Sequence, residues 1–289
     1  MKFSVCLPTG LEGVMYPIPF VEPGDFVRLG QACERLGYDS AWANDHITTQ
    51  HYVRRLFPET PPAFYDVLVT LTAVAMTTTR LRVGTALLVL PMHEPVYLAK
   101  QAATLDRLSG GRFILGVGVG AYREEFLAWG PRLAGVRRGE LMDEGLEALD
   151  RLFTQRRATY AGRHLAFRDV EMFPKPAQSP FPVYVGGHNL QAVDRAARWG
   201  SGWLPGWRPF EELRERIDRL RERAAALGRD LSRQVEANLV GSPATILEKV
   251  ARLEAIGVQH CCALMIPADS VSEMLDQMQR FAEEVMQRR

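Results

Sequence analysis

Residues Arg80–Glu125 read RLRVGTALLVLPMHEPVYLAKQAATLDRLSGGRFILGVGVGAYREE, and this stretch decides the fold of the chain. It begins with an apolar run at Leu81–Leu88, takes on helical spacing over Pro95–Leu108, and returns to an apolar run at Phe113–Val117. Two apolar runs that flank an amphipathic helix are typical of a βαβ unit with parallel strands covered on both faces. The stretch therefore predicts a parallel α/β fold.

The same alternation of strand and helix continues along the whole chain. The expected strands are Lys2–Leu7, Ser40–Ala43, Leu81–Leu88, Phe113–Val117, Pro182–Val185, Gly202–Leu204, Gln234–Leu239 and Val258–Met265. The expected helices are Pro23–Leu36, Asp66–Thr78, Pro95–Leu108, Gly139–Thr154, Leu190–Trp199, Pro209–Leu227, Pro243–Ile256 and Val271–Met286. This alternation, without a break in composition, predicts a (β/α)8 TIM barrel as a single domain over residues 1–289. A doubly wound open sheet is the alternative.

Three long segments interrupt the alternation. His46–Tyr65 and Gly120–Arg138 each follow a strand, so they are loop insertions at the C-terminal mouth, where barrel enzymes keep their active sites. Arg156–Pro180 lies between a helix and a strand, nominally at the opposite end, and its alternation around Gly162 predicts a β-hairpin.

Composition limits the classes of partner. Lys+Arg 35 against Asp+Glu 34 gives a net charge of +1, which argues against nucleic acid. No apolar stretch reaches the roughly 20 residues that span a bilayer, and the first residues do not resemble a signal peptide. We therefore expect a cytoplasmic protein with no membrane partner. Cys6, Cys33, Cys261 and Cys262 lack metal-ligand spacing, so they are expected to be reduced core thiols, and no metal site is expected.

Three polar residues directly follow the second expected strand. Asn44, Asp45 and His46 offer donors, acceptors and one group that titrates near neutrality. Their position at the end of a buried strand favours a functional site, although Asp45 as a turn cap and His46 as a loop residue form the alternative.

Glycine recurs at every second position after Leu115. Gly116, Gly118 and Gly120 do not match the dinucleotide fingerprint GxGxxG, because the spacing differs and the motif follows the fourth strand. One strand face without side chains would admit a planar ring, or it would allow tight packing inside the barrel. Spacing alone leaves both interpretations open.

Paired glycines mark a second site. Gly186 and Gly187 end a strand just before a helix, where backbone N–H groups and the helix dipole bind phosphate. Further on, Trp203 and Trp207 stand beside glycines, where they either wall a substrate pocket or pack in the core.

Together these motifs resemble the luciferase-like monooxygenase superfamily, closest to its F420-dependent oxidoreductase branch, over nearly the whole chain. The resemblance rests on the NDH after the second strand, on the stretch quoted first, and on PKPAQSPFPVYVGG and AARWGSGW. It implies a TIM barrel that binds a deazaflavin, F420, with its ring at the C-terminal mouth; FMN is the alternative cofactor.

The resemblance also implies residue roles. Asp45 and His46 match an Asp-His pair beside the ring, with His46 as the catalytic acid or base. The strand around Thr85–Leu88 matches one whose bulge, often with a non-prolyl cis peptide, supports the back of the ring, so we expect a distortion near Ala86-Leu87. The residues implied to bind cofactor are Asn44, Asp45, Thr85, Ala86, Leu87, Gly116, Gly118, Val119, Gly120, Gly186, Gly187 and His188.

One position departs from the family pattern. Sugar-phosphate dehydrogenases of the family carry a glutamate directly after the glycines, where this chain has Ala121, which puts sugar oxidation by that mechanism in doubt. Other reductases of the family also use an acidic side chain at the ring. Here Glu124 and Glu125 are the residues available, and the sequence does not separate them.

The function implied by the resemblance is hydride transfer between the deazaflavin and a small organic substrate, in a homodimer. The alternatives are an FMN-dependent monooxygenase, which usually needs a separate reductase, and a non-catalytic barrel. Tyr52, Phe57, Phe64 and Trp129 in the mouth loops favour an apolar or aromatic substrate without naming it.

Overall fold

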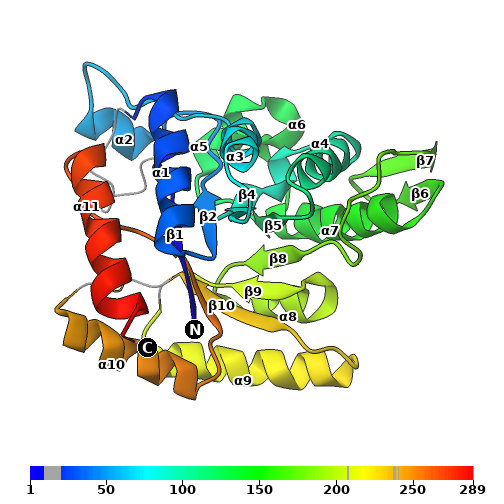
Figure 1. The fold of residues 1–289 in the computed structure, drawn as a ribbon. Coiled ribbons are helices and arrows are strands. Elements are labelled where there is room, and N and C mark those ends of the chain that lie inside the picture. The colour runs from blue at the N-terminus through cyan, green and yellow to red at the C-terminus, as the bar shows by residue number, and fades with distance from the viewer. Residues whose placement is uncertain (10–20, 207, 237–238, 240, 289) are drawn as a thin grey trace.

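Eight parallel strands close into a barrel in the computed structural model, which describes residues 1–9, 21–206, 208–236, 239 and 241–288 (Figure 1). Each of the eight pairs in parallel with two neighbours, and the ring closes because β3 pairs with both β2 and β5. The barrel strands are β1 (Lys2–Cys6), β2 (Ser40–Ala43), β3 (Arg82–Thr85), β5 (Phe113–Gly118), β8 (Val183–Gly186), β9 (Gly202–Leu204), β10 (Ser232–Glu236) and β11 (His260–Leu264). The predicted (β/α)8 barrel is confirmed.

Helices surround the barrel on its outside (Figure 1). They are α1 (Pro23–Leu36), α3 (Val67–Met76), α4 (Pro95–Leu108), α7 (Arg138–Thr154), α8 (Leu190–Trp199), α9 (Phe210–Ala226), α10 (Pro243–Ala255) and α11 (Val271–Phe281), which a π-helical turn, η3 (Ala282–Met286), continues. Helix α1 illustrates how the sequence determines where a helix begins and ends. It buries the stripe that includes Phe26 and Leu29, and it ends at Gly37, whose φ of 83° is left-handed. Strand β10 begins two residues earlier than predicted, at Ser232 instead of Gln234, and residues 237, 238 and 240 lie outside the described part.

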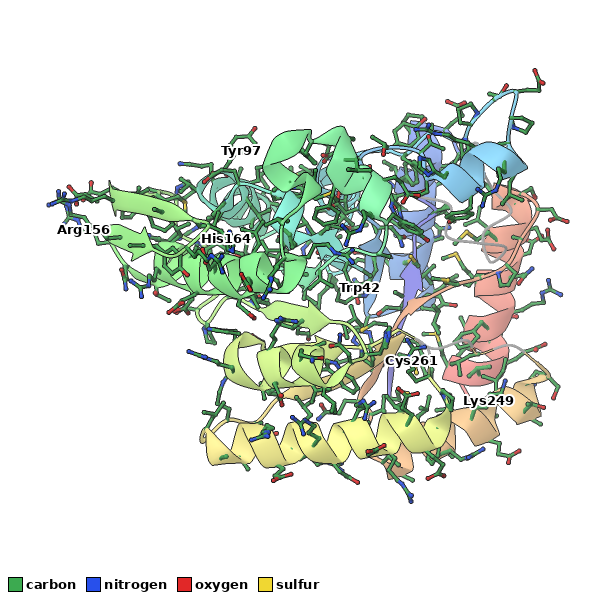
Figure 2. The ribbon with its side chains drawn as sticks, turned by 180° about the vertical axis from the view of Figure 1, so that it is seen from behind. Trp42, Tyr97, Arg156, His164, Lys249 and Cys261 are labelled. Carbon is green, nitrogen blue, oxygen red and sulfur yellow. The ribbon has the colours of Figure 1, made fainter. Side chains whose placement is uncertain are left out.

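The centre of the barrel is filled by Trp42, which is fully buried (Figure 2). Its ring stacks on that of Tyr184 at 6.0 Å, and a Cβ on Gly84 would lie only 2.6 Å from its Cε3 atom. Trp42 Nε1 donates to Ser40 Oγ at 2.9 Å, so the indole N–H keeps a partner inside the barrel. The interior is thus packed, and the barrel is not a pore.

The third strand is interrupted at the mouth. After β3 comes the peptide Ala86-Leu87, which is cis, and then β4 (Leu88–Val89) and the 3₁₀ turn η2 (Leu90–Met92). Gly84 pairs with Ile114 and Leu88 with Val117, so four residues of one strand span three of the other. One extra residue bulges here, and the expected distortion near Ala86-Leu87 is confirmed.

The loops contain elements that the sequence did not predict. Helix α2 (His51–Leu56) follows β2, while α5 (Arg123–Ala128) and α6 (Pro131–Ala134) follow β5. The hairpin of β6 (Ala158–Ala161) and β7 (Ala166–Val170) was predicted and is confirmed.

The hairpin folds back along α7. Glu144 of α7 accepts from the backbone N–H groups of Arg163, His164 and Leu165 at 2.8–2.9 Å. Leu165 also packs against a small apolar cluster near the mouth that contains Val89 and Phe126. The third insertion therefore reaches toward the functional end of the barrel.

The cysteines and the apolar segments remain to be compared with their predictions. Cys6, Cys33, Cys261 and Cys262 are all buried and none of them forms a disulfide, as expected. In the part of the chain that the structure describes, no helix is long and apolar enough to cross a bilayer.

Glu34 provides a stability prediction. Its carboxylate accepts from the backbone N–H groups of Thr79, Arg80 and Leu81 at 2.8–3.2 Å. Burial opposes ionisation, but these hydrogen bonds outweigh it and lower the pKa of Glu34 to about 2. At pH 7 we expect Glu34→Gln to lower the free energy of unfolding by about 1–2 kcal/mol. Denaturant unfolding measures this loss.

The pH dependence identifies the cause. Because the folded-state pKa of Glu34 lies below its ordinary value of 4.5, its contribution is complete above about pH 4.5 and disappears as pH falls toward about 2. The difference between wild type and Glu34→Gln should therefore shrink across that window. A constant difference would contradict the role of the charge, and Glu222→Gln on exposed α9 is the matched control.

Candidate active site

Asn44, Asp45 and His46 leave β2 at the mouth, and all three are buried, with exposed fractions of 4%, 6% and 9%. The end of β1 holds the first of them: Cys6 Sγ contacts Asn44 Oδ1 at 3.1 Å, and Asn44 N donates to Thr9 Oγ1 at 2.8 Å. The segment is therefore fixed by its neighbours and is not an exposed turn.

Asp45 forms hydrogen bonds to the segment that follows the bulge. Its Oδ2 accepts from the backbone N–H of Val89 and from His93 Nε2, both at 2.8 Å. Burial disfavours the carboxylate, but the hydrogen bond and charge of His93, with the Val89 N–H, outweigh it and lower the pKa of Asp45. Asp45 is thus an anion that positions β4. His93 was not among the predicted site residues, because its partner Asp45 lies 48 positions earlier in the sequence.

His46 lies among buried hydrogen-bonding side chains from separate segments. Its Nδ1 is 2.7 Å from Gln50 Nε2 and 3.3 Å from Glu125 Oε1. Gln50 precedes α2 and is fully buried, while Glu125 is in the first turn of α5 and is 1% exposed. Glu124 instead accepts from the backbone N–H of His51 at 3.1 Å. The structure therefore separates the two glutamates: only Glu125 contacts the imidazole.

Aromatic side chains pack around the same imidazole. The rings of Phe64 and Tyr122 lie 5.4 and 5.9 Å from the His46 ring, and Tyr52 lies 5.7 Å from Tyr122. Of the loop aromatics named from the sequence, Phe64 thus packs on His46 and Tyr52 packs on Tyr122, whereas Trp129 is 52% exposed. His46 thus packs against aromatic rings on one side and contacts Gln50 and Glu125 through Nδ1.

The glycine ladder packs against the bulge. A Cβ on Gly118 would lie 2.8 Å from Leu87 Cδ1, and one on Gly186 would overlap the same side chain. A Cβ on Gly116 would overlap the carbonyl oxygen of Thr85. The absence of side chains at these glycines therefore leaves space for the bulged segment. This supports the interpretation that the ladder serves tight packing inside the barrel. Direct contact of these glycines with a cofactor stays a prediction.

The other residues assigned to cofactor binding lie close by. Thr85 and Ala86 are buried, Leu87 is partly buried, and Val119 packs at the edge of the core. Gly120 has a left-handed φ of 77° directly after β5.

The second glycine pair forms a turn before α8. Gly187 has a φ of 112°, and its carbonyl accepts from Trp203 Nε1 at 2.9 Å. Trp203 is 1% exposed and therefore packs in the core, while Trp207 lies outside the described residues. Burial, then Arg208 and Arg216, lower the pKa of His188. Glu212 opposes this shift and lies 3.8 Å from Arg208 and 3.6 Å from Arg216, so the two arginines are partly neutralised. The Gly187 N–H donates to the Leu204 carbonyl at 3.2 Å, and phosphate binding at this turn stays a prediction.

One polar atom in the mouth indicates a missing donor. Gln50 Oε1 is buried and accepts no hydrogen bond from the described residues. Such an atom requires a partner, because an unsatisfied buried acceptor is unfavourable. An N–H or O–H group of a bound isoalloxazine-like ring, its ribityl chain or a substrate would supply it. Within the described ranges, no group of three or more His, Cys, Asp or Glu residues is placed to hold a metal ion.

Comparison with known proteins gives a consistent picture. A family model described as "Luciferase-like monooxygenase" matches residues 1–238. An uncharacterised protein of Mycobacterium tuberculosis is 32% identical over 245 residues, which cover 81% of this chain and 82% of the relative. An FMNH(2)-dependent dimethylsulfone monooxygenase of Pseudomonas putida is 32% identical over 170 residues, which cover 58% of this chain and 47% of the relative.

Solved structures share the fold over the full length. Monooxygenase RslO1 from Streptomyces bottropensis has a TM-score of 0.85 at 21% identity and covers 100% of this chain and 99% of its own. An F420-dependent secondary alcohol dehydrogenase in complex with an F420-acetone adduct has a TM-score of 0.79 at 15% identity, again over 100% and 99%. At these identities the likeness concerns the barrel alone.

Proposed function

The chain belongs to the luciferase-like monooxygenase family, and we propose that it is an oxidoreductase that uses the deazaflavin F420 to transfer a hydride to or from a small organic substrate. The coarser conclusion, a flavin- or deazaflavin-dependent oxidoreductase, rests on the family itself. One observation carries the finer proposal: a buried histidine, His46, contacts a buried glutamate, Glu125, at the barrel mouth.

The proton chemistry of His46 supports this choice. A bound deazaflavin supplies or accepts the hydride. When a hydride leaves or joins a carbon that bears oxygen, a proton must leave or join that oxygen. We assign this exchange to His46, because an imidazole is a side chain that can both take up and release a proton. Phe64 and Tyr122 pack around it and limit the access of water.

The residues that would hold the cofactor fall into two sets. The bulge from Thr85 to Leu87, with Asn44 and Asp45, would lie against the ring. The turn from Gly186 to His188, which lies near Arg208 and Arg216, would hold the phosphate.

FMN-dependent oxygenation is the second candidate. The identity of 32% to the FMNH(2)-dependent dimethylsulfone monooxygenase favours it. An enzyme of that kind would use molecular oxygen and usually a separate reductase. Because carbon replaces N5 in a deazaflavin, F420 does not support the same oxygen chemistry well, so the identity of the cofactor decides between the two.

A binding titration tests the proposal. We expect F420 to bind the purified protein with micromolar or tighter affinity and FMN to bind at least about tenfold more weakly, which corresponds to about 1.4 kcal/mol. Fluorescence of each cofactor measures both constants. Binding of FMN alone would overturn the F420 assignment in favour of the monooxygenase, and binding of neither would favour a non-catalytic barrel.

A matched pair of variants checks the phosphate turn in the same titration. Gly187 is unsuitable for substitution because its φ of 112° strains any other residue, whereas His188 is exposed. His188→Glu should weaken cofactor binding more than His188→Gln, and the difference should shrink with added salt because it is electrostatic. Equal affinities for both variants would argue against this turn as the phosphate site.

The proposal includes a homodimer that uses α3 and α4. Helix α3 reads VLVTLTAVAM, which has no charged residue, yet Val69 and Met76 are 69% and 58% exposed. Tyr97 of the neighbouring α4 is 66% exposed and lies on the outside of the molecule (Figure 2). An apolar helix at the surface favours contact with a second copy of this chain.

A further inference from the structure

One nitrogen of the His46 imidazole, Nδ1, lies within hydrogen-bond distance of both a donor and an acceptor. Gln50 Nε2, at 2.7 Å from His46 Nδ1, is an amide nitrogen and only donates. Glu125 Oε1, at 3.3 Å from the same Nδ1, only accepts when it is ionised. One ring nitrogen cannot accept from the first and donate to the second at the same time. The position of the ring proton therefore depends on which partner prevails.

The two arrangements differ in chemistry. When Nδ1 accepts from Gln50, a neutral His46 carries its proton on Nε2 and cannot take another proton there. When Nδ1 donates to Glu125, a neutral His46 has a lone pair on Nε2, and a charged His46 has a second proton there. Only the arrangement with Glu125 lets Nε2 exchange a proton with a substrate.

We infer that Glu125 is the positioning residue of the reaction: its carboxylate keeps a proton on Nδ1 of His46, so that Nε2 exchanges the proton, while the Gln50 amide stabilises the alternative tautomer. This inference rests on the proposed function. In the oxidation of an alcohol, Nε2 of His46 would take the hydroxyl proton as C–O becomes C=O, and a bound deazaflavin would supply the acceptor for the hydride. Reduction runs in the opposite direction.

The contacts of Gln50 leave its amide hydrogens with acceptors in both arrangements. Gln50 Nε2 lies 3.2 Å from Glu125 Oε1 and 3.2 Å from the carbonyl oxygen of Thr48, besides its contact with His46. When Nδ1 takes up a proton, the amide therefore keeps two acceptors for its two hydrogens. Glu125 is 1% exposed, so its charge acts on the imidazole with little screening by water.

The adjacent residue supplies the control. Glu124 has the same side chain on the same helix, but it accepts from the backbone N–H of His51 at 3.1 Å. Glu124→Gln therefore removes a nearby negative charge without removing a contact of His46.

The test is nitrogen NMR of the histidine rings in the cofactor-free protein, with His46→Gln to assign its signals. In wild type we expect Nδ1 to be protonated in a substantial fraction of neutral His46. Glu125→Gln should shift neutral His46 toward the Nε2–H tautomer, Gln50→Leu should shift it toward the Nδ1–H tautomer, and Glu124→Gln should leave it unchanged. An unchanged tautomer in Glu125→Gln, or equal shifts in both glutamate variants, would overturn the inference.

A kinetic measurement adds a second readout. We expect Glu125→Gln to lower kcat by about 10–100-fold with KM within about threefold and with an altered pH profile of kcat. An equal loss at every pH would indicate a structural role instead, and Glu125→Gln is chosen over Glu125→Leu because it keeps the shape of the side chain. If the wild type does not use F420, the proposed function fails, while the NMR result still decides the inference.

Discussion

We expect His46→Ala to lower kcat by about 10²–10⁴-fold and to leave the affinity for F420 within about threefold of wild type. The loss in kcat is large because the variant removes the group that exchanges the proton. The change in cofactor affinity is small because the phosphate of the cofactor would be held elsewhere, at Gly186–His188. His46 is 9% exposed and packs on Phe64 and Tyr122, so its truncation also leaves a space of imidazole size. Stopped-flow turnover and fluorescence titration measure the two quantities separately.

That space permits a chemical check of the role. Added imidazole should restore part of the lost turnover in His46→Ala, with a pH dependence that follows the added imidazole. The control is His51→Ala, because the side chain of His51 is 61% exposed on the same loop and should change kcat by less than about threefold. Equal losses of turnover and cofactor affinity in His46→Ala would contradict the acid–base role and would assign His46 to binding.

The sequence predicted those elements whose ends carry strong local signals. The bounds of α1, α4 and α8 and of β2 and β9 match their predictions. Gly37 in a left-handed conformation ends α1, and prolines begin α1 and α4, so local chemistry marks these helix ends in the sequence. Helices α2, α5 and α6 were missed because four to six residues are too few to display a helical period.

The sequence predicted only those residues of the candidate site that are adjacent along the chain. Asn44, Asp45 and His46 are adjacent in sequence, and the end of a buried strand marks them. The contact between His46 and Glu125 joins residues 79 positions apart through two irregular loops, and no periodicity encodes it. His93 was missed for the same reason, since its partner Asp45 is 48 positions away. The ladder was ambiguous because its packing partner, Leu87, belongs to the bulge of another strand.

Gly116→Ala should be the most destabilising single-methyl substitution in the ladder, with a loss of about 2–4 kcal/mol in the free energy of unfolding. A Cβ at Gly116 would overlap the carbonyl oxygen of Thr85, which is backbone and moves only if β3 moves. Thr85 Oγ1 also donates to the Gly116 carbonyl at 2.6 Å, so the two strands cannot separate without loss of that bond. Chemical denaturation at pH 7 measures the loss.

Two further glycines make this measurement specific. Gly118→Ala should cost only about 1 kcal/mol, because its Cβ would meet the end of the Leu87 side chain, which can turn aside. Gly135→Ala should be neutral, since nothing lies within 4 Å of its Cβ position and its φ is −109°. If Gly116→Ala were as stable as Gly135→Ala, the packing account of the ladder would be wrong. If Gly118→Ala lost F420 binding while its stability fell by no more than about 1 kcal/mol, the displaced Leu87 would be part of the surface on which we propose that the ring lies.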